Sequence, residues 1–293
     1  GRDNKMERCE EITVNSISGG KTSAYIAANY PADYNVFALV RTDDKKCMFP
    51  DPKLRQMVSD RIGKEFIGTL EDDVIINTIF DLEQYIGTRI DWVSGKTFED
   101  VVSKEGMLPS PIRRYCTAEL KMRPMFEFWL ANIGQPCLFR IGFRANEQKR
   151  AKNVMSKYNK RGFLEIKHII GKHKNGNNKW KVFEWQRQEY PLIKDRIFKD
   201  NIEQYWKDKL VRFAYINNCV GCFHRSIPLL KKMWQVHENK MQFFSDLELN
   251  RKYPNDTLKA DDTLKYQDIK LWNLQTELSF DDFNDCDSGY CGL

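Results

Sequence analysis

The stretch that decides the fold is Glu11-Ile12-Thr13-Val14-Asn15-Ser16-Ile17, followed directly by Ser18-Gly19-Gly20-Lys21-Thr22-Ser23. The first seven residues predict a β-strand. The paired glycines then predict a tight turn, and the residues from Thr22 to Asn29 predict a helix. A strand, a glycine turn and a helix in this order are typical of an α/β fold.

The alternation of strands and helices continues through the first half of the chain. Residues 35–40 are mostly apolar, which suits a strand that is buried on both faces. Further strands are expected at residues 90–93 and 137–142, and helices at residues 52–62, 72–85 and 124–131. This pattern predicts βαβ units and an α/β fold, a three-layer sandwich with a mostly parallel sheet.

The second half of the chain is less regular. The pattern breaks down between residues 151 and 181, where residues 172–179 predict a hairpin tip or a loop. Helical periodicity returns over residues 198–210 and 227–249. We therefore expect an α/β domain over residues 1–215 and a helical C-terminal region over residues 216–293 that ends in a cysteine-bearing tail.

Length and composition are those of a globular protein. The chain has 293 residues, of which 41% are hydrophobic and 30% charged. It has no apolar run long enough to span a bilayer and no apolar signal-peptide core near its start, so we expect a cytoplasmic protein without a membrane partner. The net charge of +6 permits an anionic partner. The most basic stretch, residues 144–181, is either a solvated surface or a surface for a polyanion.

The glycine turn has the chemistry of a phosphate-binding loop. Glycines let the backbone approach an anion closely, and successive N–H groups at a helix N-terminus then face it. Lys21 adds positive charge, while Thr22 and Ser23 add hydroxyl donors. A Walker A loop is excluded because Asn15 stands where its first glycine is required. A turn that binds no ligand is the remaining alternative.

Eight cysteines make metal or thiol chemistry a second question. Without a secretory signal, a disulfide framework is not expected. Cys219-Val220-Gly221-Cys222 is a CxxC motif, which can bind zinc, ligate iron in a cluster or act as a dithiol.

The loop resembles the PP-loop of the adenine nucleotide α-hydrolase superfamily, usually Ser-Gly-Gly-x-Asp-Ser, with Thr22 in place of the aspartate. Later blocks, in family order, resemble the phosphoadenosine phosphosulfate reductase family over roughly residues 12–225. These blocks are Arg41-Thr42-Asp43-Asp44 with Met48-Phe49-Pro50-Asp51, residues 114–124, residues 141–150, and Tyr190-Pro191-Leu192-Ile193 with residues 202–206. The resemblance extends to phage members and members that modify DNA or tRNA.

The resemblance implies a nucleotide site at the loop and at the ends of later strands. The implied nucleotide-binding residues are Ser16, Ser18, Gly19, Gly20, Lys21, Thr22, Ser23, Asp43, Lys121, Gly142, Arg144, Glu147 and Arg150. Arg144 and Arg150 would grip phosphate or sulfate oxygens, with Glu147 orienting one of them; surface salt bridges are the alternative. Asp43 or Asp44 would contact ribose or Mg²⁺, and Lys121 would offset phosphate charge.

The resemblance also implies roles for the cysteines. Cys116 occupies the position of a cluster ligand in the iron–sulfur members, so we expect a [4Fe–4S] cluster on Cys116, Cys219, Cys222 and either Cys286 or Cys291. Zinc on the same set, with His224 as a substitute ligand, and unligated thiols stay open. The ending Tyr290-Cys291-Gly292-Leu293 resembles that of the reductases, where the cysteine is the nucleophile. The implied catalytic residues are Cys291, Lys21 and Arg144.

Two chemistries follow from the family. In the first, ATP binds the loop and the enzyme acts in sulfur transfer or substrate adenylation, with tRNA or DNA as a partner. In the second, adenylyl sulfate is reduced by attack of Cys291, with a thioredoxin-like reductant as partner. We favour the first, because Thr22, Asp43 and the single cysteine at position 116 depart from the reductases. A non-catalytic nucleotide or nucleic-acid-binding module is the alternative from another class, and a homodimer is left open.

Overall fold

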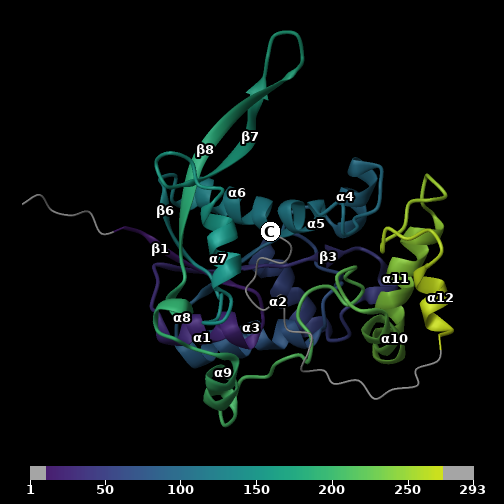
Figure 1. Ribbon diagram of the computed structural model, residues 1–293, viewed down its shortest axis with the longest axis horizontal. Coiled ribbons are helices and arrows are strands. Elements are labelled where there is room, and N and C mark those ends of the chain that lie inside the picture. The colour runs from purple at the N-terminus through teal and green to yellow at the C-terminus, as the bar shows by residue number, and fades with distance from the viewer. Residues whose placement is uncertain (1–10, 273–293) are drawn as a thin grey trace, which may run out of the picture.

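The computed structural model describes residues 11–272, and its centre is a six-stranded sheet (Figure 1). The strand order is β5-β2-β1-β6-β8-β7. The strands are β1 Thr13–Ile17, β2 Tyr34–Ala38, β5 Ile90–Val93, β6 Cys137–Arg140, β7 Leu164–Lys172 and β8 Asn178–Glu189. All neighbouring pairs are parallel except β7 with β8. The predicted mostly parallel sheet is thus confirmed.

Helices cover both faces of this sheet, in agreement with the expected three layers. The helices α1 Lys21–Asn29, α2 Pro52–Ile62, α3 Val74–Ile86 and α9 Lys199–Trp206 pack on one face. The helices α6 Arg123–Asn132 and α7 Gln148–Met155 pack on the other. Successive side chains of strand β2 point to opposite faces of the sheet. Val36 faces α6, and Phe37 faces α3.

A third core lies beside the sheet. It joins α10 Ile227–Val236, α11 Glu238–Leu249 and α12 Tyr266–Lys270 to the helix α4 Phe98–Glu105. Buried residues of this core come from both sides of residue 216, among them Val40 and Phe244. The remaining short elements are β3 Arg41–Thr42, η1 Lys45–Cys47, β4 Gly68–Thr69, α5 Tyr115–Thr117, the π-turn η2 Ala118–Met122 and α8 Pro191–Lys194.

Two expectations about the second half are corrected. The predicted single helix over residues 227–249 is two helices, because the chain turns at His237 so that α10 and α11 pack against each other. Residues 164–189 form a long hairpin, of which only the tip was predicted. Most of the outer hairpin is exposed on both faces, so no alternation of apolar and polar residues marks its strands. None of the helices within residues 11–272 is long and apolar enough to cross a bilayer.

Candidate functional site: a glycine loop and a cysteine cavity

The glycine loop lies at the point where the strand order reverses. From β1 the chain moves to β2 and β5 on one side, and then returns to β6 on the other side of β1. Residues 18–20 and 141–144 therefore follow two neighbouring parallel strands at the same edge of the sheet. In open α/β sheets, this crevice beyond the carboxyl ends of the strands is where ligands bind.

The loop is held in one shape by its own serines. The backbone N–H of Ser18 donates to Oγ of Ser23 at 3.0 Å, and the two hydroxyl oxygens lie 3.0 Å apart. Gly19 has φ +85°, and a Cβ there would lie 2.5 Å from Cγ2 of Ile75 in the first turn of α3. Only glycine fits this conformation and this close approach.

Helix α1 begins without a side-chain cap. Its N-cap residue is Gly20, and no side chain accepts a hydrogen bond from the first turn there. The helices α2 and α10, by contrast, are capped by Asp51 and Ser226. The first amides of α1 have no partner within the helix, so they form a ready position for an anion.

Lys21 is directed toward α9 rather than across the loop. Its Nζ lies 2.6 Å from Oε2 of Glu203, and its carbonyl oxygen accepts a hydrogen bond from Nε1 of Trp206 at 2.9 Å. A groove of about 1000 Å³ runs beside it, lined also by Lys207 and Tyr215. Glu203, which lies within the family-like block of residues 202–206, is thus the partner of the loop lysine.

Across the switch point, one carboxylate joins two arginines. Oε2 of Glu147 accepts from the backbone N–H of Arg144 at 2.7 Å and from its Nε at 3.2 Å. Oε1 of Glu147 accepts from Arg150 at 2.6 Å. Arg144 is buried, and Arg150 lies over the ring of Phe143. The pairs are therefore not free surface salt bridges, because Glu147 and Phe143 fix both guanidinium groups.

The other predicted loop residues are spread around this edge. Asp43 follows β3, is exposed, and lies 3.7 Å from the guanidinium of buried Arg41. Gly142 is buried just beyond β6. Ser16 points into the core, where its hydroxyl lies 3.8 Å from the sulfur of Met125.

Three of the predicted metal ligands line one cavity of about 50 Å³. Cys116 precedes η2, and Cys219 and Cys222 come from the CxxC motif. His224 also lines this cavity, and burial lowers its pKa. The glycine inside the motif is required, because a Cβ on Gly221 would lie 2.2 Å from the ring of Phe244. Cys286 and Cys291 lie outside the described residues.

A buried cation, Arg225, and a half-buried one, Lys259, support the backbone of the CxxC loop. The guanidinium of Arg225 donates to the carbonyl oxygens of Asn217 and Cys219, both at 2.8 Å. The ammonium of Lys259 donates to the carbonyl oxygens of Phe223 and Arg225, both at 2.8 Å. Sequence analysis missed both cations, since nothing in the local pattern marks them.

Lys121 connects the cavity to a buried acid. Its Nζ donates to Oε1 of Glu71 at 2.9 Å and to Oδ1 of Asn218 at 3.1 Å. Burial disfavours the charge of Lys121, but Glu71 and the neighbouring sulfurs outweigh it, so the pKa of Lys121 is raised. The other oxygen of Glu71, Oε2, is buried without a hydrogen-bond partner. Lys121 therefore lines the cysteine cavity, and its predicted contact with phosphate stays a prediction.

Burial disfavours the thiolate form of two cysteines in this cavity, Cys116 and Cys219. Burial raises the pKa of Cys116 to about 11 and raises that of Cys219 well above its usual value, with nearby Glu71 adding to the second effect. Burial also raises the pKa of Cys47 and of Cys137 to about 12, and these two thiols lie in the packed core. A metal would reverse this preference, because thiolates are the form that binds.

Cysteine sulfurs are the donor type that a thiolate-bound centre needs, and the two residues predicted as its fourth ligand, Cys286 and Cys291, lie outside residues 11–272. Three sulfurs share an apolar cavity, cations lie around them, and the orphaned oxygen of Glu71 lies nearby. As placed, no three His, Cys, Asp or Glu side chains within the described residues converge on a single metal ion.

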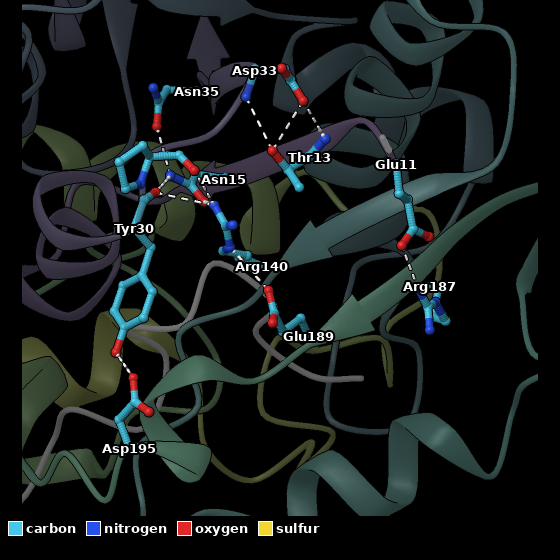
Figure 2. A network of polar contacts seen from close by, with 11 residues as sticks. Glu11, Thr13, Asn15, Tyr30, Asp33, Asn35, Arg140, Arg187, Glu189 and Asp195 are labelled. Atoms are coloured by element: carbon cyan, nitrogen blue, oxygen red, sulfur yellow. Dashed lines mark hydrogen bonds and ion pairs between the residues drawn. The ribbon is translucent and has the colours of Figure 1, made fainter. Parts of the chain in front are cut away.

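A second polar cluster lies at the opposite end of α1 (Figure 2). Asn35, Asn15, Arg140 and Glu189 form a row across four strands. Arg140 donates to the carbonyl oxygens of Tyr30 and Pro31 at 3.2 and 2.6 Å, and Asn15 donates to Tyr30 at 2.9 Å. These contacts fix the C-terminal end of α1.

Comparison with known proteins does not assign this chain to a family. Neither the scan of protein-family models nor the search of curated proteins finds a match to this chain.

Proposed function

We propose that this chain is a PP-loop enzyme of the phosphoadenosine phosphosulfate reductase family that binds ATP or adenylyl sulfate. The phosphates would lie on the amides between Ser18 and Ser23, and the enzyme would act in sulfur transfer or substrate adenylation. One observation carries the proposal: the uncapped glycine loop lies at the switch point of a parallel sheet, beside Arg144 and its partner Glu147.

Each part of the edge would contribute a separate interaction. The loop amides would bind the phosphate oxygens next to the transferred group, where the positive end of the α1 dipole favours negative charge. Arg144, held in place by Glu147, would direct paired N–H groups at the sulfate or the leaving phosphate. Asp43 would accept from the ribose or contact Mg²⁺.

The cysteine cavity would hold the cofactor. Cys116, Cys219 and Cys222, with Cys286 or Cys291 as the fourth ligand, would bind a [4Fe–4S] cluster, which supplies electron or sulfur transfer when bound. Lys121, Arg225 and Lys259 would offset the negative charge of the thiolates.

A nucleotide panel tests the proposal. ATP, adenylyl sulfate and 3′-phosphoadenylyl sulfate are titrated against the chain and against Gly19→Ala, with Gly63→Ala as the control. Gly63 also has positive φ, but open space surrounds its Cβ position. We expect Gly19→Ala to lose about tenfold or more in affinity and Gly63→Ala to bind as the wild type does. Equal affinity in all three proteins would refute the site.

Product analysis separates the branches. Pyrophosphate release that depends on tRNA or DNA supports the ATP branch. Sulfite release from adenylyl sulfate that Cys291→Ser abolishes supports the reductase, and binding without any release supports the non-catalytic module. Anaerobic purification with iron, sulfide and zinc analysis tests the centre, and about four iron atoms per chain are expected; a colourless zinc protein would contradict the cluster.

A further inference from the structure

The hairpin of β7 and β8 extends away from the body of the protein (Figure 1). Its strands pair from Glu165 with Glu184 out to Lys172 with Asn178, a length of about 27 Å at the usual rise per residue. At the tip, the N–H of His173 donates to the carbonyl of Asn177 at 2.8 Å. The arm, defined here as residues 166–183, is therefore an ordered two-stranded ribbon.

The base of the arm is fixed to α6. The ring of Phe126 lies 5.1 Å from that of His168 and 5.4 Å from that of Phe183. Arg123 donates to the carbonyl oxygen of Lys167 at 2.9 Å. These contacts hold the arm at a defined angle, so its outer part is presented to a partner rather than folded back.

The arm carries positive charge only. It contains five lysines and two histidines, and no Asp or Glu: Lys167, Lys172, Lys174, Lys179, Lys181, His168 and His173. The nearest carboxylates, Glu165 and Glu184, lie at its base, where Glu184 pairs with Arg161 at 2.9 Å. All five lysines are exposed.

Exposed apolar side chains lie between the lysines. Ile169 is 40% exposed and stands opposite Trp180, which is 56% exposed. Val182, which is 48% exposed, stands opposite Lys167 on the same face. Large apolar groups among exposed lysines, away from the core, indicate a contact surface rather than a solvated one.

We infer that the arm binds duplex DNA, with the ribbon seated in the major groove. The B-form major groove is about 12 Å wide and admits a two-stranded β-ribbon, whereas the major groove of A-form RNA is too narrow. The lysines would contact phosphates on both sides of the groove, and Ile169, Trp180 and Val182 would contact base edges and thymine methyl groups. This surface goes beyond the nucleotide site and would stand even if the loop bound no nucleotide.

Fluorescence anisotropy with the full chain tests the inference. The probes are a DNA duplex of about three helical turns, one of its single strands, and an RNA duplex of the same sequence. The arm variant is Lys172→Gln, Lys174→Gln and Lys179→Gln together. The control variant is Lys53→Gln, Lys104→Gln and Lys252→Gln together, which removes the same charge from exposed lysines elsewhere.

We expect the wild type to bind the DNA duplex more tightly than the other two probes. The arm variant should lose about tenfold or more in affinity, and its salt slope between about 50 and 200 mM should fall by about three. The control should stay within about threefold of the wild type. Equal losses in the two variants, or tighter binding of either other probe, would overturn the inference. Nucleotide affinity is measured in a separate titration. A failure of the proposed nucleotide site is therefore distinguishable from a failure of the arm to bind DNA.

Discussion

The two ends of helix α1 differ in their hydrogen bonding to the sheet. At the C-terminal end, side chains of two strands donate hydrogen bonds to backbone carbonyl oxygens (Figure 2). Arg140 donates to the carbonyl oxygens of Tyr30 and Pro31, and Asn15 donates to that of Tyr30. At the N-terminal end, the N-cap residue Gly20 provides no side chain. Both ends are polar and close to the sheet, yet within residues 11–272 only the C-terminal end is held by side chains of the strands.

This difference in hydrogen bonding distinguishes polar groups that stabilise the fold from polar groups that we propose bind a ligand. At the C-terminal end, called the closed end below, side chains from two strands hydrogen-bond the carbonyl oxygens of Tyr30 and Pro31, which serves stability. The N-terminal end, called the open end below, is shaped by Ser18 and Ser23, whose hydroxyl groups fix the loop and, through Ser18, accept from the Gly20 N–H at 3.5 Å. Mutations at the closed end should change stability, and mutations at the open end should change ligand affinity.

The largest expected effect comes from breaking the closed end. Arg140→Met removes donors to Tyr30, Pro31 and Glu189, and should lower the free energy of unfolding by about 2–4 kcal/mol. Urea denaturation measures it. Arg187→Met is the matched control, because its pair with Glu11 is exposed and should contribute under about 1 kcal/mol. Equal losses for the two variants would refute the structural role of the row.

A smaller effect is expected from loosening the open end. Ser23→Ala removes the acceptor of the Ser18 N–H and should weaken nucleotide binding about tenfold, or 1.4 kcal/mol. Ser59→Ala is the control, since Ser59 also accepts a backbone N–H, from Phe66 at 2.9 Å, but far from the loop. Calorimetric titration of both variants measures the effect, and a nucleotide affinity unchanged in Ser23→Ala would contradict the loop assignment.

The smallest effect concerns the hydroxyl of Tyr30, which donates to Asp195. Burial, with Asp195 adding, raises the pKa of Tyr30 above its ordinary value of 10.0. Stability from this bond is therefore fully present below pH 10 and declines as the pH rises toward the folded-state pKa. Tyr30→Phe should cost about 1 kcal/mol at neutral pH. Denaturation of the wild type and Tyr30→Phe at several pH values should show that the difference between their free energies of unfolding narrows above pH 10. A difference that widens there would contradict a raised pKa of Tyr30 in the folded protein.

Local patterns predicted the regular elements well. The predicted helix over residues 52–62 is α2 itself, because Asp51 caps it, Pro52 starts it and Gly63 ends it in the left-handed conformation. The parallel sheet followed from the alternation of strands and helices. Gly19 and Gly20 could be placed in the turn between β1 and α1 from sequence, because this turn is continuous in the chain.

Long-range contacts could not be predicted in the same way. The bond from Arg140 to Tyr30 spans 110 residues, and that from Lys121 to Glu71 spans 50. Glu71 carries no motif, and its role appears only when β4 and η2 are brought together at the cysteine cavity. Only the tip of the hairpin was predicted, because the outer parts of its strands are exposed on both faces and show no alternation of buried and exposed residues.

The most direct test is to observe the loop amides while nucleotide is added. In ¹H–¹⁵N spectra of the labelled chain titrated with ATP, the account predicts saturable shifts of the Gly19, Gly20 and Lys21 amides. The amides of Asn15 and Arg140, at the closed end, should stay in place. Binding that shifts other regions and leaves the three loop amides unmoved would contradict the account.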